Sequence, residues 1–226
     1  MIPTFIFLMV KRYQKIHPEQ FRQLISKIRV TLKLLFFLLI ALAFARIAQG
    51  QEKKLSYTVK RNGSHVGTLN IKEHKNGTRT IYKMDSEVKM KLLVSFKVIA
   101  IEEAMYDNGI LIYSSVYQKM NGDEQANTKT KICNNNYIID DDGEVESLGQ
   151  YPIRYNMVCV YTCEPVNVRQ IYSDKYQKFL PLQQMAPHHY KISFPNGASN
   201  EYFYQNGICT TIKVNHGMYK AEMILN

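Results

Sequence analysis

An all-β fold is predicted for most of this chain, from the placement of its glycines and the spacing of its apolar residues. Six of the 11 glycines directly follow an asparagine, at Asn62-Gly63, Asn76-Gly77, Asn108-Gly109, Asn121-Gly122, Asn196-Gly197 and Asn206-Gly207. Asp142-Gly143 is a seventh dipeptide of this kind. Asn-Gly favours the two-residue turn of an antiparallel hairpin, because both central residues of that turn need positive φ. Between the turns, apolar and polar residues alternate, as they do in half-buried strands.

We therefore expect a single domain over residues 51–226, with about ten antiparallel strands joined by hairpins. Such a sheet must protect its two edges, and closure removes the edges altogether. The predicted architecture is an up-and-down barrel or a strongly curled sheet, with one short helix against an opening. A sandwich of two sheets is the alternative.

The first 50 residues resemble an export signal. An apolar run of 12 residues, Leu34–Ala45, follows a basic region and precedes small residues. A membrane span needs about 20 apolar residues, so this order predicts a signal peptide with a long basic N-region. Cleavage is expected after Gly50, with Ala45 as the second candidate, and an uncleaved signal anchor stays open. No cysteine follows either position, so the predicted exported protein, periplasmic or extracellular, is not a lipoprotein.

Charge supports this division of the chain. The formal net charge is +10, from 29 basic and 19 acidic residues. Residues 1–50 hold eight of the basic residues and one of the acidic ones, which leaves 21 against 18 in residues 51–226. The basic excess therefore belongs to the N-terminal segment, and the composition argues against a nucleic-acid-binding domain. Any membrane contact is expected only through the uncleaved N-terminal segment.

The longest alternating run lies between Val88 and Ala100. It is too long for one flat strand, so we expect a bend or bulge near Leu92–Ser95. Shorter runs of the same period follow the turns, at Leu55/Tyr57/Val59, Leu69/Ile71, Ile110/Ile112, Tyr190/Ile192/Phe194, Ile212/Val214 and Tyr219/Ala221/Met223/Leu225. Only Pro152–Pro165 also fits a helical period, and its flanking prolines favour a short helix there.

The order of these features resembles a family of exported bacterial proteins of unknown function. The opening Tyr57-x-Val59 with Asn62-Gly63-x-x-Val66-Gly67 resembles the first hairpin of that family. Its second half is similar to Tyr161-x-x-Glu164-Pro165, Phe194-Pro195-Asn196-Gly197 and Tyr202-x-Tyr204-x-Asn206-Gly207. The resemblance implies a periplasmic barrel-like domain of lipocalin-like shape. It brings no catalytic residues, and it says nothing about the four cysteines.

Those cysteines are Cys133, Cys159, Cys163 and Cys209. An exported chain permits disulfides, and we hypothesise at least one bridge, of undetermined pairing. Cys159 and Cys163 are too far apart to pair within one strand. Cys133 and Cys209 share strand faces with lysines, so both are expected on the more solvent-exposed face. The alternative is four reduced thiols, and the spacing does not favour a zinc site.

Other chemical motifs are weak. The acidic cluster Asp140-Asp141-Asp142-Gly143-Glu144-x-Glu146 indicates a solvated hairpin turn rather than a calcium loop. His188 and His189 would face opposite sides of a strand, so they are poor partners for one metal. No nucleophile elbow, phosphate-binding loop or zinc-protease motif occurs. We predict no catalytic, cofactor-binding or metal-binding residues, and no cofactor.

Residues 51–226 hold 15 of the 16 tyrosines, and the chain has no tryptophan. Tyrosines could line a cavity or fill the core. The leading hypothesis is a non-enzymatic cell-envelope domain that binds a lipid-like or other apolar small molecule in a barrel cavity. The alternatives are an envelope-assembly module that binds proteins, and a hydrolase whose site is built from distant strands.

Overall fold

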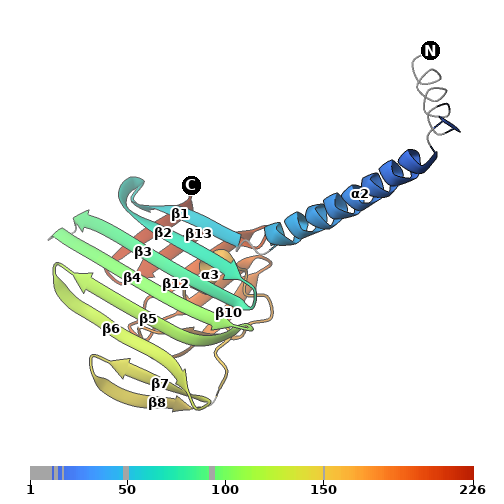
Figure 1. The fold of residues 1–226 in the computed structure, drawn as a ribbon. Coiled ribbons are helices and arrows are strands. Elements are labelled where there is room, and N and C mark those ends of the chain that lie inside the picture. The colour runs from blue at the N-terminus through green and yellow to red at the C-terminus, as the bar shows by residue number, and fades with distance from the viewer. Residues whose placement is uncertain (1–11, 13–14, 17, 48–50, 92–94, 150) are drawn as a thin grey trace. The chain divides into compact units, whose positions relative to one another are not determined.

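The computed structural model describes residues 12, 15–16, 18–47, 51–91, 95–149 and 151–226 (Figure 1). The chain forms two compact units, Met1–Gln49 and Gly50–Asn226. The first unit contains helix α2, Pro18–Ile47, which includes the apolar run of the predicted signal. Among the described residues, no helix combines the length and apolar character needed to cross a membrane. Cleavage of the segment stays a prediction.

The second unit is a sheet of 14 antiparallel strands, more than the ten or so expected. Its first eight strands are β1 Gln51–Arg61, β2 Ser64–Asn76, β3 Arg79–Lys91, β4 Ser95–Asp107, β5 Ile110–Met120, β6 Asp123–Cys133, β7 Asn136–Asp141 and β8 Glu144–Gly149. The last six are β9 Gln170–Ser173, β10 Lys178–Ala186, β11 His189–Ser193, β12 Ser199–Gln205, β13 Ile208–His216 and β14 Tyr219–Leu225.

The strand order explains how the chain builds one sheet from two halves. Strands β1 to β8 run outward in sequence order to one edge, and β9 to β14 return from the other edge. The halves join where β14 pairs with β1, with Tyr57 opposite Leu225. The sheet curls but does not close, so β8 and β9 remain its edges. The all-β curled sheet is therefore confirmed. The closed barrel and the two-sheet sandwich are both wrong, because one continuous sheet ends in two edges.

The turn chemistry follows the prediction at four of the six Asn-Gly dipeptides, where both residues have positive φ, whereas at Asn76-Gly77 and Asn196-Gly197 only the glycine has it. All six Asn-Gly dipeptides lie at turns between consecutive strands, and Asp142-Gly143 joins β7 to β8. At Asn62-Gly63 both residues have positive φ, +49° and +79°, which is the geometry that favours Asn-Gly. Asn134-Asn135 makes a further turn of positive φ without glycine.

The long alternating run of the sequence is two strands rather than one bent strand. Strands β3 and β4 pair antiparallel, with Lys91 opposite Ser95, so the chain reverses direction there. Residues 92–94, where the bend was expected, lie outside the described residues. The predicted short helix is α3, Cys159–Thr162, which is four residues long and lies inside the expected window.

Helix α3 belongs to the connection between the two halves, residues 151–169, which we call the crossover segment. This segment fills the inside of the curled sheet, since Ile153, Val158 and Val160 are fully buried in the hydrophobic core. Its backbone pairs with β5 through Leu111 N–H and the Ile153 carbonyl, at 2.8 Å. It also pairs with β9, where Asn156 and Tyr172 form a parallel bridge.

Candidate functional site

The inner face of the sheet carries the core, and strand register shows which side chains share it. Tyr82 and Met84 of β3 are buried and stand opposite Ala104 and Glu102 of β4. Every second residue of these strands therefore points inward. The inner face holds three features in turn: tyrosines that hold the crossover segment, a buried polar network, and an apolar strip.

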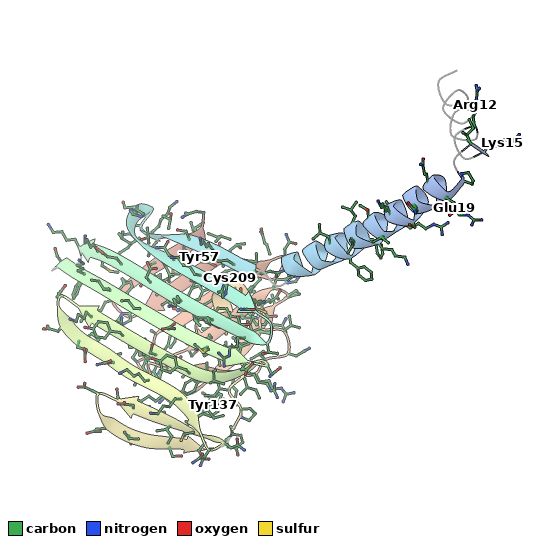
Figure 2. The ribbon with its side chains drawn as sticks, viewed as in Figure 1. Arg12, Lys15, Glu19, Tyr57, Tyr137 and Cys209 are labelled. Carbon is green, nitrogen blue, oxygen red and sulfur yellow. The ribbon has the colours of Figure 1, made fainter. Side chains whose placement is uncertain are left out.

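The tyrosines hold the crossover segment by donating hydrogen bonds to its backbone. Tyr204 donates to the Val160 carbonyl at 2.7 Å. The Tyr57 hydroxyl lies 3.3 Å from the Tyr161 carbonyl of the segment and 2.7 Å from the Cys209 carbonyl of β13, so it links the segment to that strand. Figure 2 shows Tyr57 and Cys209 in the domain. A four-residue helix leaves most of its carbonyls without an intrahelical donor, and these hydroxyls supply one. Buried hydroxyls in turn need partners, which explains why tyrosine fills this core.

A polar network lies between β5, the crossover segment and the turn after β9. Asp174 accepts hydrogen bonds from the Ser114 hydroxyl and, at 3.0 Å, from Asn156 Nδ2. Tyr106 donates to Asn156 Oδ1 at 3.0 Å, and the Cys159 thiol lies 3.3 Å from the same oxygen. Burial raises the pKa of Asp174 to about 6, against the opposing effect of its hydrogen bonds.

Glu102 lies beside this network on the inner face of β4. Burial and, to a smaller extent, nearby Asp174 raise its pKa to about 8, against the opposing effect of Lys175. Lys175 follows Asp174 in the turn after β9, and its ammonium donates to Gln118 Oε1 of β5 at 2.6 Å. An acid, an amine and an amide from three elements therefore lie close to one another.

Beyond Glu102, the inner face continues as an apolar surface that is only half buried. We call its five residues the apolar strip: Val88 and Met90 of β3, Phe96 and Val98 of β4, and Met120 of β5. They are cross-strand neighbours, since Val98 stands opposite both Val88 and Met120, and Met90 stands opposite Phe96. The crossover segment buries the inner face around Tyr82 and Met84, whereas the strip keeps partial exposure.

The reactive groups of this region are buried or already hydrogen-bonded. The Cys159 thiol is buried, which raises its pKa to about 12, so it is a poor nucleophile at neutral pH. Ser114 donates to a carboxylate and has no histidine partner among the described residues. No group of three metal-ligating side chains occurs in the described part of the chain. What the site does offer is an apolar surface with charged and polar groups at one end.

The cysteines divide into two pairs by burial. Cys133 and Cys163 are exposed, Cys159 and Cys209 are buried, and all four are free cysteines in the structure. Cys133 lies on the more solvent-exposed face as predicted, whereas the prediction for Cys209 was wrong. A β-bulge between β12 and β13 skips Thr210 in the register, so Cys209 turns inward. The proposed disulfide stays a prediction about the oxidised protein.

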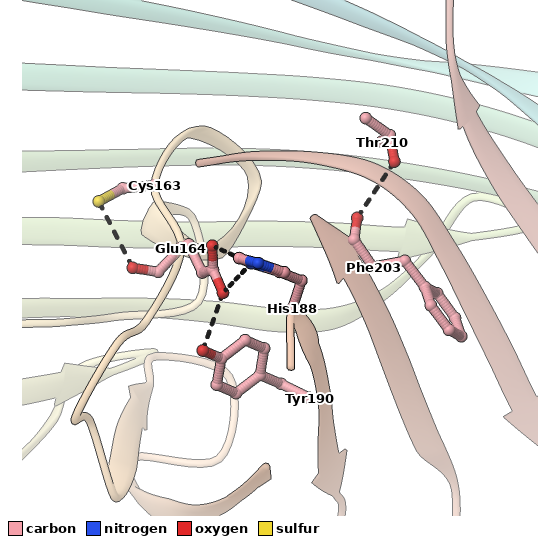
Figure 3. A network of polar contacts seen from close by, with 6 residues as sticks. All are labelled: Cys163, Glu164, His188, Tyr190, Phe203 and Thr210. Carbon is pink, nitrogen blue, oxygen red and sulfur yellow. Dashed lines mark hydrogen bonds and ion pairs between the residues drawn. The ribbon is translucent and has the colours of Figure 1, made fainter. Parts of the chain in front are cut away.

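The two histidines make separate contacts, although only His189 lies on a strand and His188 lies in the turn before β11. His188 lies 3.1 Å from the Glu164 carboxylate, and Tyr190 donates to the same carboxylate at 2.9 Å (Figure 3). His189 instead lies 2.9 Å from Glu201. The acidic cluster forms the solvated turn between β7 and β8, where Gly143 N–H donates to Asp140 Oδ1 at 3.0 Å. No calcium loop follows it, because the chain enters β8 at Glu144.

Sequence reasoning missed Ser114, Asn156 and Asp174, because these residues come from distant segments. Glu102 could have been identified from the sequence. It continues the inward positions of Val98 and Ala100, so an acid occupies a core position of an alternating strand. A charged residue at such a position costs free energy unless it has a partner or changes protonation.

Comparisons with known proteins agree with the fold. The family model "Domain of unknown function (DUF6134)" matches residues 57–226. No curated protein matches the chain. A solved structure that resembles it is the beta-barrel-like protein of domain of unknown function DUF1849 from Brucella abortus, with a TM-score of 0.51 and 9% identity. That match covers 79% of this chain and 96% of the other.

Proposed function

The chain belongs to the DUF6134 family of domains of unknown function, and we propose that it is an exported, non-enzymatic domain that binds an apolar chain with a polar end. The apolar strip carries this proposal. Its five side chains form one continuous inner surface, and the crossover segment leaves them half exposed. Partly exposed apolar side chains that adjoin one another favour an apolar ligand.

The polar groups at the end of the strip give the ligand an orientation. Glu102 stands two residues from Ala100 and four from Val98 along β4, on the same face. Lys175 and Gln118 lie beside it. An alkyl chain would lie along Val98, Val88 and Met120, with its polar end toward Glu102 and Lys175. The crossover segment fills the rest of the interior, so the ligand surface that the sequence predicted as a barrel cavity is restricted to this part of the inner face.

The experiment compares two charge substitutions on one strand. Val98→Asp puts a carboxylate into the strip, and Ile99→Asp puts the same group on the outer face of the adjacent position. Both positions are half buried, so the two variants are matched. Palmitate binding to the full chain is measured by native mass spectrometry and by displacement of a fluorescent fatty acid.

We expect Val98→Asp to weaken palmitate binding by about tenfold or more, because a charge would have to be desolvated against the chain. Ile99→Asp should bind as the unmodified chain does. The proposal fails if native mass spectrometry detects neither co-purified nor added lipid, or if both variants bind equally well.

A further inference from the structure

The two edge strands of the sheet, β8 and β9, differ in their backbone pairing. Strand β9 is covered by the crossover segment, because Tyr172 N–H donates to the Tyr155 carbonyl at 2.9 Å and Met157 N–H donates to the Tyr172 carbonyl at 3.1 Å. Strand β8 pairs with β7 on one side only. Among the residues that the structure describes, none pairs with its other side. Of the two edge strands, β8 is therefore the one whose described residues leave a free edge for another strand.

The side chains of β8 indicate which residues a strand docked on it would have. Glu144 and Glu146 lie on one face of β8, and Val145 lies on the other with 65% of its surface exposed. In the described part of the chain, neither glutamate has a basic residue within ion-pair distance. A paired strand places its side chains about 5 Å from those of β8, so charge and apolar character can be matched residue by residue.

We propose that β8 docks an extended basic segment of another protein, which adds to the sheet as a fifteenth strand. The segment alternates Lys or Arg, which face Glu144 and Glu146, with an apolar residue that faces Val145. Its backbone bonds to the free edge of β8 supply affinity, and the alternation supplies specificity. Strands β6 and β7 lie between this edge and the apolar strip, so the interaction does not rest on the proposed lipid binding.

A second copy of the chain fits this edge poorly in the register centred on Val145. A two-fold dimer would pair β8 with β8 antiparallel, and centring that pair on Val145 sets Glu144 opposite Glu146 twice. Like charges directly opposite each other destabilise a strand pair. The glutamates therefore disfavour self-association in that register and favour a basic partner.

The test uses the full chain and a labelled ten-residue peptide that alternates lysine and valine. Fluorescence anisotropy measures binding, and amide hydrogen exchange locates it. A second peptide has the same sequence with N-methyl groups on alternate amides, which keeps the charge but removes strand hydrogen bonds. The protein variants are Glu144→Lys with Glu146→Lys, and a control pair, Asp123→Lys with Glu124→Lys, at the exposed start of the internal strand β6, where only β5 pairs with it.

We expect saturable binding of the first peptide, and slowed exchange of amides within Glu144–Gly149. Reversing both β8 charges should weaken binding by about tenfold or more, because two attractive cross-strand pairs become repulsive. The control pair should stay within about twofold of the unmodified chain. Equal binding of the N-methylated peptide, unchanged exchange in β8, or an equal loss in the control pair would each overturn the proposal.

Discussion

The hydroxyl of Tyr204 offers the sharpest test of how the crossover segment is held. Tyr204 is 4% exposed, and it donates to the Val160 carbonyl at 2.7 Å. The helical donor for that carbonyl would be Glu164 N–H, which instead donates to the Gly207 carbonyl at 3.0 Å. Tyr204→Phe therefore leaves a buried carbonyl unsatisfied, while the ring and its edge contact with Tyr190 remain.

An unsatisfied buried polar group costs about 1–3 kcal/mol, so we expect Tyr204→Phe to lower the free energy of unfolding by about 2 kcal/mol. For a domain of this size, that corresponds to a fall in melting temperature of about 4–8 °C. Urea and thermal unfolding, followed by circular dichroism, measure both quantities.

Tyr113→Phe is the matched control. Tyr113 is half buried on the outer face of β5, and its hydroxyl bonds to none of the described residues. We expect a change below about 0.5 kcal/mol there. If Tyr204→Phe is as stable as this control, the hydroxyl does not hold the crossover segment. The tyrosine hydroxyls of the core would then not explain why this segment stays in place.

Three further predictions follow from burial and close contact. Because the pKa of Asp174 is raised to about 6, its protonated form is favoured in the folded state, so stability should fall as pH rises from about 4 to 6, by at most about 3 kcal/mol from this group; urea unfolding of Asp174→Asn should show a smaller fall over this range, with the remainder from Glu102, whose pKa is also raised. In the reduced native chain, a thiol reagent should label the exposed pair of cysteines rapidly and the buried pair only after denaturation; equal free-thiol counts in denatured protein with and without reductant would refute the disulfide hypothesis. Gly67→Ala should destabilise the domain by about 1–3 kcal/mol, because its Cβ would lie 2.2 Å from the Glu87 carbonyl oxygen; Gly217→Ala, with nothing within 4 Å, is the control, and equal stability of the two would contradict the steric argument.

The candidate site could be anticipated only in part. Alternation predicted the inward positions of Val88, Val98 and their neighbours, and the structure places them on one inner face. It could not predict that the strip stays half exposed, because exposure depends on where the crossover segment packs. The pairing of Asp174 with Ser114, 60 residues away in sequence, likewise follows from the packing of distant segments.

By itself, the sequence determined the hairpins. An Asn-Gly turn is specified by a few adjacent residues, since the φ preference of those residues acts locally. The same is true of strand alternation, which has a period of two residues. Only the tertiary structure decided that the sheet stays open, that the crossover segment fills it, and that a bulge turns Cys209 inward. These outcomes depend on free-energy differences among packed arrangements of distant strands, and no short stretch of the chain encodes such a difference.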